Sequence, residues 1–197
     1  MPAMFAALLA GLTAGLIHVL SGPDHLAAVA PLTGGRRTAA WRAGFLWGLG
    51  HSGGVLAVGL LALALRGALP IDALSSWSER IVGVTLVGIG LWGFTRVLRG
   101  PIHSHLHVRA AAAVGVLHGV AGSSHFLGVL PALALPSATA SLGYLSGFAL
   151  GTVAAMSGFA GGLGLIGGSD DAPRHRRWLL SASSAIAIVV GLAWIRS

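Results

Sequence analysis

Long apolar stretches alternate with short polar connections along this chain of 197 residues. An α-helix needs about 20 mostly apolar residues to cross the hydrocarbon core of a bilayer. Six stretches reach that length, so the pattern predicts an all-α integral membrane protein with one domain of six transmembrane helices. The predicted spans are Phe5–Leu32, Ala39–Leu65, Trp77–Val97, Ala110–Leu135, Ala140–Ile166 and Trp178–Ile195.

The first, fourth and fifth stretches are long and contain glycine or proline, so we expect kinks or breaks in them. The first lacks the basic start and the clear cleavage site of a signal peptide. Because it also holds His18, Asp24 and His25, we expect it to remain in the mature protein.

The composition supports a membrane protein. Hydrophobic residues make up 55% of the chain, charged residues 9%, and the mean hydropathy is +0.84. A soluble domain carries about a quarter charged residues, so a soluble enzyme and a disordered chain are excluded. The absence of cysteine excludes disulfides, thiolate metal sites and cysteine catalysis.

The net charge of +7 comes from arginine alone, since the chain has no lysine. Arginines at cytoplasmic helix ends explain this charge better than nucleic-acid binding. Connections one, three and five hold nine arginines, with Arg96 assigned to the third, and the rest of the chain holds three. The positive-inside rule then predicts that these connections face the cytoplasm and that both termini lie outside. We expect a multi-pass protein of a bacterial-type cytoplasmic (inner) membrane.

A shift of 100 residues reveals an internal repeat. Both copies read G-x-x-H-x-x-x-G-x-x-H-x-x-x-V-x-P, starting at Gly15 and at Gly115. The next spans match at a shift of 99, with Gly48 over Gly147 and Leu150 opposite His51. Three spans per half reverse the second copy. We therefore expect inverted repeats over residues 5–97 and 110–195, with a site at the midplane as in many transporters.

Ionisable side chains inside spans are costly and usually face the protein interior. Between the first two histidines, Gly22 and Pro23 allow the helix to open and bring both rings to one site. Gly122, Ser123 and Ser124 replace them in the second copy and add two hydroxyls. The candidate metal ligands are His18, Asp24, His25, His51, His118 and His125.

Several imidazoles with one carboxylate suit nickel, cobalt, zinc or iron(II) and are poor for magnesium or calcium. Plainer interpretations stay open: Asp24 as a helix cap, the histidines as interhelical hydrogen-bonding groups, and the two serines as packing hydroxyls. A separate tract with alternating histidines is predicted to be a loop that could bind metal weakly or be merely polar. It contains His103, His105 and His107.

The segment from His18 to Asp24-His25 resembles the signature helix of nickel/cobalt permeases, the NiCoT and NicO group. Gly48-Leu-Gly-His51-Ser and His118-Gly-Val-Ala-Gly-Ser are similar to later segments of that superfamily and of its UreH-like members. The resemblance implies that His18, Asp24 and His25 bind the metal, with the other span histidines as partners. One extra residue before Asp24 and the smaller number of spans point to the shorter UreH-like branch.

Three functions follow from these features. The first is a permease, not an enzyme, with a divalent metal ion as substrate and nickel or cobalt favoured. The second is a membrane-embedded metalloenzyme, and the third an exporter of a small organic solute or anion. Absence of arginine deep in any predicted span counts against an anion. The expected partners are lipid and the ion, without nucleic acid, and glycine-rich faces also suit a homo-oligomer.

Overall fold

The computed structural model describes residues 2–30, 37–64, 71–99, 105–120, 123–167 and 173–196, and these ranges are helical apart from short breaks. The all-α prediction is therefore confirmed for the described part of the chain. Its helices are α1 (Pro2–Ser21), α2 (Pro23–Val29), α3 (Arg37–Ala64), α4 (Ile71–Arg99), α5 (His105–Val120), α6 (Ser123–Ala134), α7 (Ala138–Gly167) and α8 (Pro173–Arg196).

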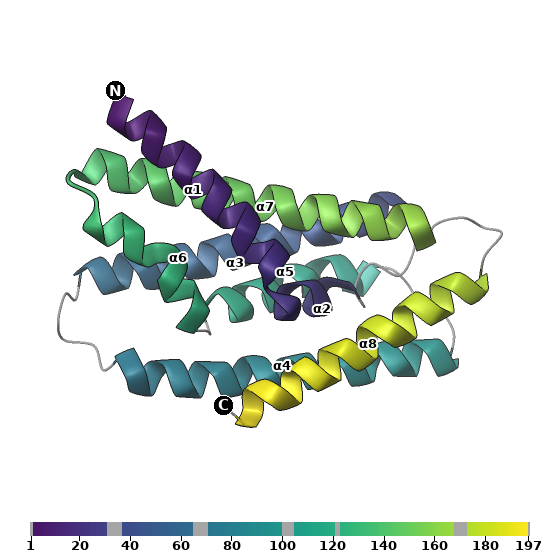
Figure 1. Cartoon of the computed structure of the whole chain (residues 1–197). Helices are drawn as coiled ribbons and strands as arrows, with labels where there is room; N and C mark the ends of the chain where they lie inside the picture. The colour runs from purple at the N-terminus through teal and green to yellow at the C-terminus, as the bar shows by residue number, and fades with distance from the viewer. Residues whose placement is uncertain are drawn as a thin grey trace.

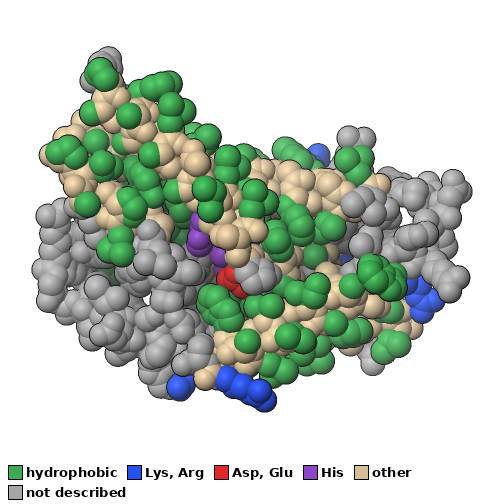
Figure 2. Space-filling model, in the orientation of Figure 1, with side chains coloured by type: hydrophobic (Ala, Val, Ile, Leu, Met, Phe, Trp, Pro, Cys, Tyr) green, Lys and Arg blue, Asp and Glu red, His purple; other side chains and the backbone are tan. Residues whose placement is uncertain are grey.

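Within the described ranges, four helices are long and apolar enough to cross a membrane, compared with six predicted spans. The predicted fourth span is divided between α5 and α6, and among the described residues α8 contributes the shorter apolar segment Leu180–Arg196. Figure 2 shows hydrophobic side chains spread over the described part of the visible face and basic ones at its rim. The four helices contain the segments Pro2–Ser21, Ala40–Leu61, Arg80–Leu98 and Ala138–Leu165.

The first predicted span is broken at Gly22. This residue has φ −90° and ψ 100°, which is extended backbone, and it separates α1 from α2. Pro23 then occupies the start of α2, where its missing N–H costs no hydrogen bond. A Cβ at Gly22 would overlap the imidazole of His25, so a larger residue here would displace that ring from its place beside Asp24. The predicted break in the first span is confirmed.

Two sequence-based assignments are wrong. The fifth predicted span has no break, because α7 is continuous; Gly143, Gly147 and Gly151 pack against α1, and the helix contains no proline. Arg96 lies inside α4 and not in a connection, and it is only 5% exposed. Its guanidinium lies 5.1 Å from the centre of the Trp92 ring, so an aromatic face helps to bury the charge.

The prediction of a loop at the histidine tract is also wrong in part. His105 and His107 belong to the first turns of α5, whereas His103 lies outside the described residues. Only the loop is contradicted, and metal binding by this tract stays a prediction.

The helices pack in four main pairs: α1 on α7, α3 on α5, α3 on α7 and α4 on α8 (Figure 1). Glycines allow these close approaches, as at Gly115 against the backbone of Trp47 and at Gly147 against that of Leu8. In Figure 1 the N-terminus lies at the upper left, near the turn between α6 and α7, and the C-terminus lies at the lower edge beside α4. The α1–α2 break lies near the middle, between α7 and α8.

We expect Gly147→Ala to lower the melting temperature of the protein in detergent by several degrees. A Cβ there would overlap the carbonyl oxygen of Leu8, so α1 and α7 would have to separate. Gly158→Ala is the matched control on the same helix, because its Cβ would meet nothing within 4 Å. Circular dichroism melts of both variants check this, and equal melting temperatures would contradict the packing described.

Candidate metal centre

Four helices bring five of the predicted ligands together at the centre of the bundle. His18 comes from the last turn of α1, and Asp24 and His25 from the first turn of α2. His51 lies on α3 and His118 in the last turn of α5. Asp24, His25, His51 and His118 are at most 2% exposed. Among the described residues, acid and histidine atoms are visible in Figure 2 near the middle of the face.

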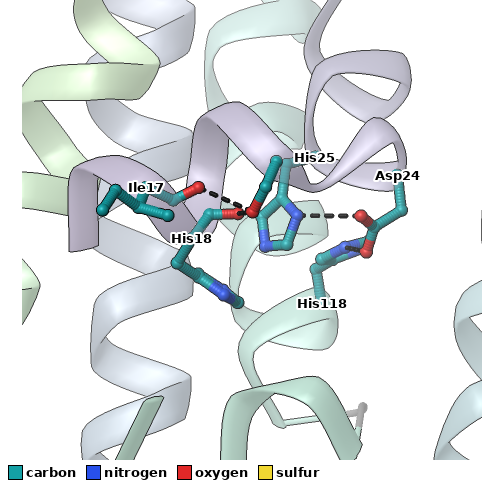
Figure 3. Close-up of polar contacts among 6 residues, drawn as sticks. Ile17, His18, Asp24, His25 and His118 are labelled. Atoms are coloured by element: carbon teal, nitrogen blue, oxygen red, sulfur yellow. Dashed lines mark hydrogen bonds and ion pairs between the residues drawn. The ribbon is translucent and has the colours of Figure 1, made fainter. Parts of the chain in front are cut away.

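The Asp24 carboxylate joins two histidines from different halves of the chain. Its Oδ1 lies 2.9 Å from Nδ1 of His25, and its Oδ2 lies 2.9 Å from Nε2 of His118 (Figure 3). When these nitrogens donate their protons to the carboxylate, the other nitrogen of each ring carries a lone pair. This carboxylate–histidine arrangement is the one that orients imidazoles as metal ligands.

The imidazole rings are close neighbours. The ring centre of His25 is 4.5 Å from that of His18 and 4.9 Å from those of His51 and His118. His18 and His51 stack at 5.6 Å, although they come from different helices. His25 is thus at the centre of the group. This agrees with the expectation that the break at Gly22 brings its ring close to His18.

Two overlapping sets of side chains could each hold a metal ion. One consists of His18, His25 and His51, the other of Asp24, His25 and His118. Within each set, one ligand atom per residue lies within 4.8 Å of the others. Ligand atoms around a tetrahedral ion with bonds of about 2.0–2.1 Å lie roughly 3.4 Å apart, so small side-chain rotations would complete either site.

Two aromatic residues support the site and were missed from the sequence. The Trp47 ring stacks on His51 with centres 4.9 Å apart and planes only 8° apart. The Phe148 ring lies 5.3 Å from His18. The available signal for Trp47 was its position four residues before His51, which places both on one helix face. Phe148 had no comparable signal, because its contact depends on how α1 crosses α7.

The remaining predicted site residues lie where the structure gives no side-chain description. His125, Ser123 and Ser124 belong to α6, but only their backbone is described, as at Pro23 in α2. Gly122 lies outside the described residues. The candidate site therefore rests on His18, Asp24, His25, His51 and His118.

Two plant proteins match nearly the whole chain. Chloroplast protein FOR GROWTH AND FERTILITY 2 of Arabidopsis thaliana is 39% identical over 206 residues, which cover 95% of this chain and 55% of the plant protein. Chloroplast protein FOR GROWTH AND FERTILITY 1 is 37% identical, with 95% and 58% covered. The chain thus spans just over half the length of these relatives.

A bacterial protein is more distantly similar. Urease accessory protein UreH of Bacillus sp. (strain TB-90) is 27% identical over 177 residues, which cover 79% of this chain and 75% of UreH. This agrees with the UreH-like motifs in the sequence. No family model and no solved structure matches the chain. The chloroplast names of the plant relatives give no support to a bacterial membrane in particular.

We expect Asp24→Asn to fold normally and to bind Ni²⁺ about 10-fold or more weakly than the unchanged protein. The amide keeps the shape and one acceptor oxygen but loses the negative charge that offsets the ion and orients two imidazoles. Isothermal titration in detergent measures the affinity. Unchanged Ni²⁺ affinity in a folded Asp24→Asn protein would show that the carboxylate has only a structural role.

Proposed function

We propose that this protein is a membrane permease for divalent transition-metal ions, with nickel or cobalt favoured over zinc and iron(II). The observation that carries the proposal is the buried group of His18, Asp24, His25, His51 and His118, contributed by four helices of an otherwise apolar bundle. The distant similarity to a urease accessory protein agrees with a metal as the substrate.

The chemistry of the group favours a transition metal. Imidazole nitrogens bind nickel, cobalt, zinc and iron(II), whereas magnesium and calcium need several oxygen ligands, and here one carboxylate is available. An ionised Asp24 supplies part of the charge that a divalent ion needs in a low-dielectric interior. Burying these polar groups among lipid-facing helices is costly, which favours a functional role over a packing role.

The overlap of the two ligand sets favours transport over permanent retention. Because His25 belongs to both sets, an ion can pass from Asp24, His25 and His118 to His18 and His51 without leaving its central ligand. Protonation of the imidazoles competes with the ion, so a proton gradient can drive its release. The helix break at Gly22 places backbone flexibility beside this path.

We extend the proposal to the arrangement in the membrane: six spans in two inverted repeats. In this arrangement α1 with α2 and α5 with α6 each form one broken span, while α3, α4, α7 and α8 cross singly. The packing of α1 on α7 and of α5 on α3 supports it, because these pairs are equivalent under the repeat. The arginine distribution in the sequence favours both termini outside.

We also propose that the chain is a multi-pass protein of a bacterial-type cytoplasmic membrane, and the similarity to a Bacillus protein supports this. A membrane-embedded metalloenzyme is the second candidate, because four clustered histidines would also retain a catalytic metal. Tight retention of metal through purification distinguishes it from a permease, whose ion must exchange. Buried Arg96 weakens the earlier argument against an anion carrier, but its contact with Trp92 gives it a packing role.

Nickel uptake into proteoliposomes tests the permease. We expect the unchanged protein to accumulate ⁶³Ni²⁺ under an imposed pH gradient, and His25→Ala to reduce uptake to the level of empty liposomes, because His25 is a ligand in both sets. Ser157→Ala is the control: this hydroxyl is buried but bonds its own helix at the carbonyl of Val153.

Equal uptake by the unchanged protein and the folded His25→Ala variant would rule out the proposed site. Metal that stays bound and does not exchange with free ⁶³Ni²⁺ would favour the metalloenzyme instead. Parallel measurements with cobalt, zinc and iron(II) rank the substrates.

A further inference from the structure

The close contacts of the glycines in α1 and α5 come in matching pairs. A Cβ at Gly15 would meet the carbonyl oxygen of Phe148 and, at 2.9 Å, the backbone nitrogen of Thr152. A Cβ at Gly115 would meet the carbonyl oxygen of Trp47 and, at 3.0 Å, the backbone nitrogen of His51. Gly15 and Gly115 are equivalent in the repeat, so these contacts pair Thr152 with His51.

The glycines of α7 and α3 that face α1 and α5 give the same correspondence. A Cβ at Gly151 would meet Leu12 and the nitrogen of Leu16 at 3.0 Å. One at Gly50 would meet Ala112 and the nitrogen of Val116 at 3.0 Å. The first helix of each repeat is thus related by a shift of 100 residues, and α3 is related to α7 by a shift of 101. The shift of 99 suggested by the sequence, which set Leu150 opposite His51, does not fit these contacts.

The aromatic residues beside the site follow the same correspondence. Trp47 and Phe148 are 101 residues apart. Trp47 packs on His118, in the last turn of α5, and Phe148 packs on His18, in the last turn of α1. The Trp47 and His118 ring centres are 5.4 Å apart with planes at 52°. The Phe148 and His18 ring centres are 5.3 Å apart with planes at 42°. His51 therefore has a structural counterpart, and it is Thr152.

Thr152 is unusual among the buried hydroxyls of this chain. It is 0% exposed, and among the described residues its Oγ1 has no hydrogen-bond partner. Ser157 on the same helix instead donates to the carbonyl of Val153 at 2.6 Å, and Ser184 donates to that of Leu180 at 2.6 Å. A buried polar atom without a protein partner calls for an explanation, such as a bound ion or its water.

We propose that Thr152 belongs to the ion-binding site and hydrogen-bonds a water molecule carried by the metal ion held at His18, His25 and His51. The inference rests on the proposed function and assigns that site a further residue. An ion bound by three imidazoles keeps at least one open coordination position, which water fills. The hydroxyl accepts a hydrogen bond from this water and so orients it, which makes Thr152 a positioning residue on the side of His18.

The test compares Thr152→Val, which keeps the shape and removes the hydroxyl, with Thr152→Ser, which keeps the hydroxyl. We expect Thr152→Val to weaken Ni²⁺ binding by about 10-fold or more in isothermal titration, as removal of outer-shell partners typically does. Thr152→Ser should bind within about threefold of the unchanged protein. The visible absorption spectrum of bound Co²⁺ should change in Thr152→Val only, since it reports the ion's immediate surroundings.

Ser157→Ala is the matched control, and its affinity and spectrum should equal those of the unchanged protein. If Thr152→Val keeps both the Ni²⁺ affinity and the Co²⁺ spectrum, the hydroxyl is not at the site and the inference is overturned. Including His25→Ala separates the two proposals. Loss of binding in His25→Ala with normal binding in Thr152→Val overturns only the role of Thr152, whereas normal binding in both overturns the permease site itself.

Discussion

The site depends on one carboxylate that is buried where charge is expensive. Asp24 accepts hydrogen bonds from His25 beside it and from His118, which is 94 residues away in the chain. In lipid-facing helices an unpaired carboxylate would be too costly to keep, so α2 and α5 must stay together for either to be stable. The same bonds fix which nitrogen of each ring is available to an ion. One interaction therefore joins the two halves of the chain and prepares the ligands.

The backbone break at Gly22 is what makes that interaction possible. In a continuous helix, His18 and His25 would lie about 10 Å apart along the axis, too far for one ion. Ending α1 at Ser21 and restarting at Pro23 brings their rings to 4.5 Å. The glycine favours this geometry because an added Cβ would overlap the His25 ring and push it away from Asp24. Helix packing elsewhere serves this geometry: glycines at the crossings of α1 with α7 and α3 with α5 let backbones approach until all the rings meet.

Much of this was predictable from the sequence, and the failures have physical causes. Gly22-Pro23 indicated the break because proline and glycine act locally on the backbone, and the repeat indicated His118. The pairing of Asp24 with His118 was not predictable, because it depends on how two distant helices cross. The continuity of α7 was missed since glycine weakens an isolated helix but not one packed against neighbouring backbones. Arg96 was assigned to a connection because hydropathy ignores that its charge can lie over the face of Trp92.

The shift that relates α3 to α7 was also not predictable from the sequence, and the correct shift shows that the two halves contribute differently to the site. Matching letters in a glycine-rich chain favoured a shift of 99, since glycines pair by chance. Contacts between backbones set the shift at 101, because a close helix crossing needs glycine where the other backbone comes nearest. With that register, the first half provides His51 where the second half has Thr152. Four of the five clustered side chains, His18, Asp24, His25 and His51, thus come from the first half, and the second half contributes His118. For the permease that we propose, a symmetric set of strong ligands would hold a divalent ion from all sides, whereas ligands taken mostly from one half leave a direction in which the ion can leave.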